Sequence, residues 1–149
     1  MNLSHAYGLP PTREQAQAVL LGALDAGYDF FDTATLYGFG ANETLVGEVL
    51  SAHRSRFVLA SKCGMGGEVL KDSVDGKLAR VIDGSPAKIR AQCEASLKRL
   101  KTDVIDLYYL HRWDKRVPIE DSVGALADLV KEGKIRSICL LYTSDAADE

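Results

Sequence analysis

The sequence predicts an α/β fold in which parallel strands alternate with helices. Three apolar runs of strand length end at Asp32, Lys62 and His111, and apolar residues recur at helical spacing in the segments between these runs. No tight-turn motif joins one of these strands directly to the next. Because a crossover between parallel strands needs a segment long enough for a helix, this alternation indicates repeated βαβ units on a parallel sheet.

Four strands are expected, at residues 28–32, 57–62, 104–110 and from 135 onward. The runs are rich in apolar, β-branched or aromatic residues. The segment 64–84, between the second and third strands, is polar, contains glycine and is longer than most connections. We therefore expect it to be a loop on the functional face of the sheet.

Four helices are expected, and each begins at a residue that favours a helix start. The expected starts are Thr12 (with Gln15 as its capping-box partner), Asn42, Ser85 followed by Pro86, and Pro118. Apolar residues then recur on one face of each helix, and these faces include Val19, Cys93 and Val130. Glycines at 27 and 133 are expected to end the first and last helices.

Composition narrows the class of protein. A chain of 149 residues with 46% hydrophobic content can bury a sizeable core. The net charge of −3 and the absence of a basic block argue against nucleic acid or an anionic membrane as a partner. No apolar run is long enough to cross a bilayer, and the N-terminus has no signal-peptide pattern. Three cysteines without close pairing argue against a disulfide framework or a metal site, and they favour the cytoplasm.

Polar side chains are expected to meet at one edge of the sheet. Asp32, Lys62 and His111 each close a strand, and Tyr37 lies in the loop after the first strand. The carboxyl ends of parallel strands share an edge, and catalytic groups collect at that edge in α/β barrels. Considered singly, each residue has a structural alternative: a helix cap, a solvated charge, a structural histidine or a packing aromatic.

Together these side chains have the chemistry of a proton-transfer site. A phenol is a poor acid at neutral pH unless a nearby positive charge stabilises its phenolate. Either an ammonium or a protonated imidazole can supply that charge, so Lys62 and His111 are both candidate partners for Tyr37. Asp32 would keep the lysine charged and oriented.

Several ordered motifs resemble those of the aldo-keto reductase superfamily. They are Phe31-Asp32-Thr33-Ala34 with Leu36-Tyr37-Gly38, Asn42-Glu43 with Leu45-Val46-Gly47, Ala60-Ser61-Lys62, Ser96-Leu97-Lys98-Arg99-Leu100, Asp103-Val104-Ile105-Asp106-Leu107-Tyr108-Tyr109-Leu110-His111 and Glu132-Gly133-Lys134-Ile135-Arg136. The resemblance extends from Ser4 to Ile138 and implies a TIM barrel. It also implies that Asp32, Tyr37, Lys62 and His111 form the catalytic tetrad of the family.

The implied reaction is the reduction of an aldehyde or ketone by a hydride from NADPH. By the resemblance, Tyr37 is the general acid, Lys62 with Asp32 eases loss of its proton, and His111 orients and polarises the carbonyl. Further implied contacts are Tyr7, Gly8 and Asp32 with the cofactor, and Trp113 with the substrate, although a packing role suits Trp113 equally. An alternative within the superfamily is a non-catalytic, nucleotide-binding subunit of an ion channel, which does not require the intact tetrad.

The extent of the chain leads to a further expectation. A TIM barrel typically needs about 250 residues, so this chain matches roughly the first half of one. We expect residues 1–138 to be a partial barrel, and residues 139–149, which depart from the family pattern, to be a disordered or artefactual tail. The parent of full family length is expected to carry the reductase activity, and this chain by itself is expected to lack it.

Overall fold

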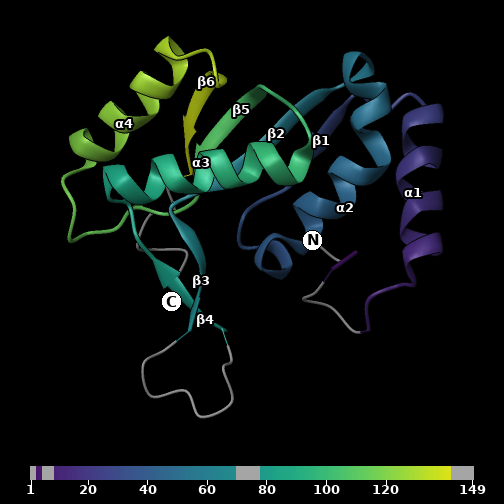
Figure 1. The fold of residues 1–149 in the computed structure, drawn as a ribbon, viewed down its shortest axis with the longest axis horizontal. Helices are drawn as coiled ribbons and strands as arrows, with labels where there is room; N and C mark the ends of the chain where they lie inside the picture. Colours follow the sequence, from purple (N-terminus) through teal and green to yellow (C-terminus); the bar gives the residue numbers. More distant parts are fainter. Residues whose placement is uncertain (1–2, 5–8, 70–77, 142–149) are drawn as a thin grey trace.

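The computed structural model describes residues 3–4, 9–69 and 78–141. Within these ranges the expected strands form one parallel sheet in the order β1-β2-β5-β6 (Figure 1). The strands are Phe30–Asp32 (β1), Val58–Cys63 (β2), Ile105–Leu110 (β5) and Ile135–Leu140 (β6). The predicted α/β class and parallel pairing are therefore confirmed. β6 runs two residues past 138, while residues 142–149 of the expected tail lie outside the described ranges, so the domain boundary there stays a prediction.

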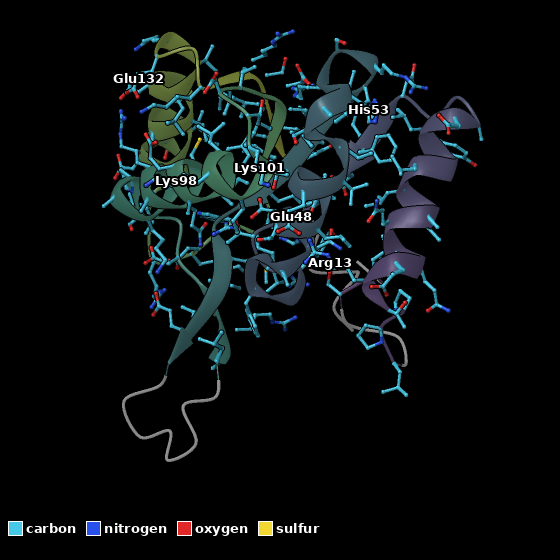
Figure 2. All side chains as sticks on the ribbon, turned by 45° about the vertical axis from the view of Figure 1, so that its right-hand side comes forward. Arg13, Glu48, His53, Lys98, Lys101 and Glu132 are labelled. Atoms are coloured by element: carbon cyan, nitrogen blue, oxygen red, sulfur yellow. The ribbon has the colours of Figure 1, made fainter. Side chains whose placement is uncertain are left out.

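Helices connect the strands and pack beside one another. The helices are Arg13–Asp25 (α1), Ala41–Leu50 (α2), Pro86–Leu100 (α3) and Ile119–Lys131 (α4), with short 3₁₀ turns at Tyr37–Gly40 (η1) and Ser51–Arg56 (η2). In Figure 1, α2, α3 and α4 lie in front of the sheet, and α1 stands beside α2. A salt bridge of 2.6 Å between Arg13 and Glu48 joins α1 to α2 (Figure 2).

Two predicted helix caps are confirmed by their hydrogen bonds. The Thr12 hydroxyl accepts from the backbone N–H of Gln15 at 3.3 Å, and the Gln15 side chain accepts from the backbone N–H of Thr12 at 3.0 Å. The Ser85 hydroxyl accepts from the backbone N–H of Lys88 at 3.4 Å. Both helices therefore begin where the sequence pattern places them.

The prediction that Asn42 caps α2 is wrong. Gly40 occupies the cap position with a φ of +98°, a left-handed conformation that favours glycine, so the helix begins two residues earlier than expected. Asn42 lies inside the helix, where its side chain accepts from the Thr33 hydroxyl at 2.8 Å and donates to the Ser4 hydroxyl at 2.9 Å. This buried amide therefore ties α2 to the end of β1.

The buried faces of α1 and α4 contain fewer apolar residues than the sequence pattern predicts. Val19 is 57% exposed and Val130 is 36% exposed. Each residue is next in the chain to a buried leucine, and one residue along a helix turns the side chain by about 100°. Only the leucine side of each pair therefore faces the core.

The loop predicted over 64–84 is replaced in part by an antiparallel hairpin, which corrects the sequence interpretation. β3 (Met65–Val69) pairs with β4 (Leu78–Ile82), and the two strands project away from the main sheet in Figure 1. Gly67 permits close approach to Phe39, because a Cβ atom at this position would lie 2.8 Å from Cε1 of that ring. Glycines required for such packing resemble loop composition, which explains the error.

The main core lies between the sheet and the helices. Leu59, Ile105 and Tyr108 are buried there from the strands, and Leu50, Ile89, Cys93, Leu126 and Leu129 from the helices. The opposite face of the sheet is more open, with Phe30 47% and Val58 42% exposed. A parallel sheet with helices on one face and an open second face is the arrangement expected of part of a barrel. None of the helices in the described ranges is long and apolar enough to cross a membrane.

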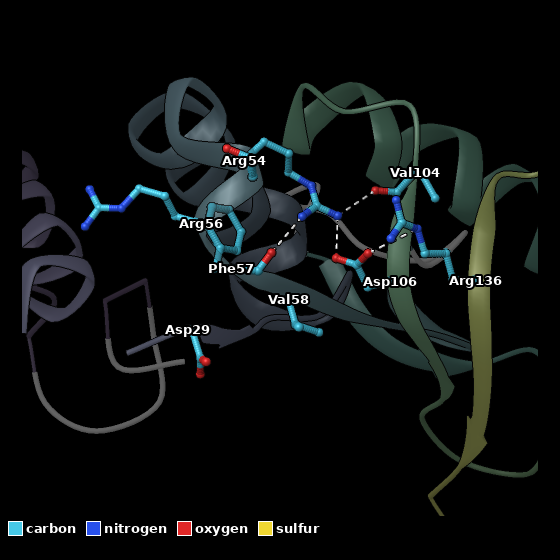
Figure 3. A pocket seen from close by; sticks show the side chains of 9 residues that line it. Asp29, Arg54, Arg56, Phe57, Val58, Val104, Asp106 and Arg136 are labelled. Carbon is cyan, nitrogen blue, oxygen red and sulfur yellow. Dashed lines mark hydrogen bonds and ion pairs between the residues drawn. The ribbon is translucent and has the colours of Figure 1, made fainter. Parts of the chain in front are cut away.

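A charged cluster ties the strands together at their amino ends. The Arg54 guanidinium donates to the backbone carbonyls of Phe57 and Val104 and to the Asp106 carboxylate at 2.5 Å (Figure 3). Asp106 also accepts from the backbone N–H of Leu59 and lies 3.3 Å from the guanidinium of Arg136. Arg54, Asp106 and Arg136 are among the residues that line a pocket of about 650 Å³. The Asp106 carboxylate at the centre of this cluster already has protein partners, so we assign the cluster a structural role in holding the strands together.

Candidate active site

The structure places the predicted strand-end residues at one edge of the sheet. Asp32 is the last residue of β1, Lys62 is the residue before the end of β2, and His111 directly follows β5. Parallel pairing aligns the strands so that Asp32 lies opposite Ala60, and Lys62 lies opposite Tyr109. Tyr37 begins η1, shortly after β1. The expected convergence of these four residues is therefore observed in the structure.

The Lys62 ammonium is the centre of the site. Lys62 is only 5% exposed, and its Nζ atom forms an ion pair with the Asp32 carboxylate. The same Nζ donates to the Thr33 carbonyl at 2.9 Å and to the Tyr37 hydroxyl oxygen at 3.2 Å. An ammonium has three protons to donate, and each has an acceptor here. The buried charge is therefore fully compensated, and one of its acceptors is the phenol.

Tyr37 is held between the ammonium and the imidazole. The Lys62 Nζ lies 4.7 Å from the centroid of the phenol ring. The Tyr37 and His111 rings meet edge to face, with centroids 5.9 Å apart and planes 85° apart. After Tyr37 the backbone takes positive φ at Gly38, Phe39 and Gly40. This tight, left-handed turn leads directly from Tyr37 into α2.

His111 is neutral at pH 7 in this environment. Burial lowers its pKa to about 4, helped by the positive charges of Lys62, Arg112 and Arg80. The sequence left open whether an ammonium or an imidazolium faces the phenol, and the structure assigns the positive charge to Lys62. His111 Nδ1 is buried and has no hydrogen-bond partner among the described residues. Most buried polar atoms in proteins are hydrogen-bonded, so an atom of this kind requires an explanation, of which a catalytic role is one.

Sequence reasoning missed Tyr109. Its ring centroid lies 5.6 Å from Lys62 Nζ, and burial together with the negative charge of Asp32 raises the pKa of its phenol. Lys62 and Tyr109 each precede the last residue of their strands. Neighbouring positions in parallel strands point to the same face, so this shared offset could have identified the contact.

The other predicted contacts are less fully described. Trp113, two residues after His111, is 41% exposed, and its indole N–H donates to the Val117 carbonyl at 3.0 Å. Its role in a substrate pocket stays a prediction. Tyr7 and Gly8 lie outside the described residues. In the described part of the chain, no cluster of three or more histidine, cysteine or acidic side chains could hold a metal ion.

Comparison with known proteins decides the family. The model of the aldo/keto reductase family matches residues 1–145. The chain belongs to this family. It is 43% identical over 145 residues to the probable aldo-keto reductase 1 of Glycine max. That alignment covers 97% of this chain and 40% of the Glycine max protein.

Solved structures of aldo-keto reductases share the fold. The glycerol dehydrogenase AKR11B4 from Gluconobacter oxydans is 31% identical with a TM-score of 0.78, over 93% of this chain and 42% of that one. An aldo/keto reductase from Klebsiella pneumoniae, in complex with NADP and acetate, is 31% identical with a TM-score of 0.73. This match covers 96% of the present chain and 43% of the Klebsiella pneumoniae chain. The described residues thus form a partial aldo-keto reductase barrel, and the chain spans about 40% of the length of these relatives.

Proposed function

We propose that a protein of full family length carrying this chain reduces an aldehyde or ketone to an alcohol, with NADPH as the hydride donor. The observation that carries the proposal is the contact of 3.2 Å between the buried Lys62 ammonium and the Tyr37 hydroxyl. Burying a charge is costly unless it is paired, and this charge is placed against a group that can release a proton. A solvated structural lysine has no need of this arrangement.

The site residues fit the nicotinamide end of the cofactor. His111 Nδ1 is a buried polar atom that still requires a partner, and the Asp32 carboxylate is 40% exposed at the open edge of the sheet. Asp32, with Tyr7 and Gly8, would hold this end of the cofactor. When bound, NADPH supplies the hydride that forms the new C–H bond at the carbonyl carbon.

Tyr37 supplies the proton that completes the reduction. The Tyr37 hydroxyl would transfer its proton to the carbonyl oxygen, on which negative charge develops during the reduction. The Lys62 ammonium, 3.2 Å from the phenol oxygen, stabilises the phenolate that remains. The Asp32 carboxylate pairs with the ammonium and holds it beside the phenol. The products are the alcohol and the oxidised cofactor.

His111 orients the substrate by a hydrogen bond. With a pKa of about 4 it is a neutral imidazole at pH 7, which carries one N–H donor and one acceptor. A neutral donor can polarise a carbonyl without competing with Tyr37 as the proton source. Electrostatic assistance of this kind acts on the charge that develops during the reaction.

Relatives support the choice of cofactor and reaction class. One aldo/keto reductase structure from Klebsiella pneumoniae contains NADP and acetate, and another aldo-keto reductase structure from this organism contains NADPH. The Gluconobacter oxydans relative is a glycerol dehydrogenase, which carries out the reverse type of reaction, oxidation of an alcohol. The free cysteines Cys63, Cys93 and Cys139 are compatible with a reducing compartment, and we propose the cytoplasm.

The test uses a chimera in which the 145 matched residues replace the corresponding segment of the Glycine max relative. Oxidation of NADPH is followed with a panel of aldehydes and ketones, and the alcohol is identified by mass spectrometry. We expect carbonyl-dependent turnover that is greater with NADPH than with NADH. Binding of NADPH without any turnover would instead favour the regulatory-subunit alternative.

A further inference from the structure

A second ion pair lies directly behind the candidate active site. Glu43 of α2 is completely buried, and its Oε2 atom accepts from Arg99 Nε of α3 at 2.7 Å. Its Oε1 atom accepts from the Ser61 hydroxyl of β2 at 2.6 Å. A buried carboxylate is tolerated only when its oxygens are satisfied, and both oxygens have partners here. The carboxylate therefore binds two helices and one strand together.

Ser61, through which Glu43 binds β2, lies next to Lys62 in the chain. Ser61 precedes Lys62 in β2, and successive strand residues point to opposite faces. The Ser61 hydroxyl bonds to Glu43 on the helical side, so the Lys62 side chain leaves the strand on the side of the site. Fixing Ser61 fixes the backbone from which the lysine extends.

The same arginine also supports the segment that carries the phenol. A Cβ atom on Gly40, the last residue of η1, would lie 2.9 Å from Arg99 Cδ and Nε, so the guanidinium packs directly against that turn. Arg99 Nη2 also donates to the Ser96 hydroxyl at 3.3 Å, and the Ser96 hydroxyl lies 3.2 Å from that of Thr35. Thr35 is two residues before Tyr37. Arg99 therefore supports the segment that carries Tyr37 in two ways: it packs directly against Gly40, and it is linked to Thr35 through the Ser96 hydroxyl.

We infer that the Glu43–Arg99 pair is a positioning device that sets the spacing between Lys62 and Tyr37. The inference rests on the proposed function, since it concerns the proton transfer between these residues and the substrate. One end of the pair holds the strand of the lysine through Ser61, and the other holds the turn of the phenol through Gly40. A displacement of about 1 Å between reacting groups can cost about a hundredfold in rate.

The sheet offers a matched control. The Arg54–Asp106 pair also joins β2 to its surroundings, because Asp106 accepts from the backbone N–H of Leu59 as well as from Arg54. This pair lies near the amino ends of the strands (Figure 3), whereas the site residues lie at the carboxyl ends of the same strands. Removing the charge of Glu43 or that of Asp106 should reduce the stability of the fold, but only the loss of the Glu43 charge should change the rate of the catalysed reaction.

The kinetic test compares Glu43→Gln, Ser61→Ala and Asp106→Asn in the chimera. We expect Glu43→Gln to lower kcat about tenfold, with KM within about twofold, and Ser61→Ala to lower kcat by a smaller factor. Asp106→Asn should lower the Tm and leave kcat within about twofold. In a Tyr37→Phe background, Glu43→Gln should have no further effect, because residues that act as a unit are non-additive. Unchanged kcat in both Glu43→Gln and Ser61→Ala, or additive losses with Tyr37→Phe, would overturn the inference.

A second measurement does not require turnover. Lys62 is 5% exposed, so an amine-reactive reagent should label it slowly, and mass spectrometry can follow the rate in each variant. We expect labelling to rise several-fold in Glu43→Gln and Ser61→Ala, and to stay unchanged in Asp106→Asn. If Glu43→Gln does not fold, Ser61→Ala decides the outcome. If the chimera has no turnover, the proposed function fails, while equal labelling of all variants separately refutes the positioning role.

Discussion

The lowered pKa of His111 predicts a specific dependence of the free energy of unfolding on pH. In the folded protein the pKa of this imidazole is about 4, against an ordinary value of 6.5. Between these pH values the unfolded chain binds a proton that the folded protein does not bind. The free energy of unfolding therefore falls as the pH is lowered from 6.5 toward 4, and this contribution is constant above and below that window.

The size of the effect follows from the same two pKa values. Each pH unit between them corresponds to about 1.4 kcal/mol, which gives an upper value of about 3 kcal/mol. His111 is partly exposed, and screening by solvent reduces the expected contribution to about 1–2 kcal/mol. Removal of the titrating group by His111→Gln should therefore reduce the loss of stability between pH 7 and pH 4.5 by about 1–2 kcal/mol.

The assay is urea denaturation of the chimera at the two pH values, followed by circular dichroism. Other carboxylates also lose stabilisation at low pH. Partial burial raises the pKa of Asp106, but the hydrogen bond from the Leu59 backbone N–H and the contact with Arg54 lower it by more, and Arg116 lowers the pKa of Asp114. Only the difference between variants is therefore informative. An identical pH dependence in the parent chimera and in His111→Gln would refute a neutral His111 with a lowered pKa.

Two further predictions concern packing. Gly47→Ala should destabilise the chimera by about 1–3 kcal/mol in chemical denaturation, because a Cβ there would lie 2.7 Å from Leu100 Cα where α2 crosses α3. Gly124→Ala, in α4 with open space around it, should instead be neutral or stabilise by up to about 1 kcal/mol, and equal effects of the two changes would contradict this packing. A further prediction concerns the chain of 149 residues expressed alone, which should melt without a sharp transition and lack turnover. The reason is that Phe30 and Val58 are exposed on the open face of the sheet. A cooperative melt together with turnover would disprove this prediction.

The sequence predicted the features that depend on local pattern. Strand ends at Asp32, Lys62 and His111 could be located from apolar runs, and parallel pairing then requires that they share an edge. Thr12 and Ser85 were recognisable as caps because their bonding partners lie three residues away. Local spacing is sufficient for contacts of this kind.

The features that were missed depend on contacts between distant segments or on backbone conformation. Glu43 and Arg99 are 56 positions apart, and no local spacing reveals that they share a buried pair. The positive φ of Gly40, which moves the start of α2 away from Asn42, is a property of the folded turn. The glycines of β3 favour a loop by composition, but in the structure Gly67 packs against the Phe39 ring and Gly66 lies against the Gln92 side chain.

The most direct test of the proposed mechanism is the Tyr37→Phe variant of the chimera, with turnover and NADPH affinity measured on the same sample. The change removes only the hydroxyl that lies 3.2 Å from Lys62 Nζ. We predict that carbonyl reduction falls by about a hundredfold or more while the Kd for NADPH stays within about twofold, because loss of a general acid affects the chemical step. Turnover close to that of the unmodified chimera would show that Tyr37 is not the proton donor.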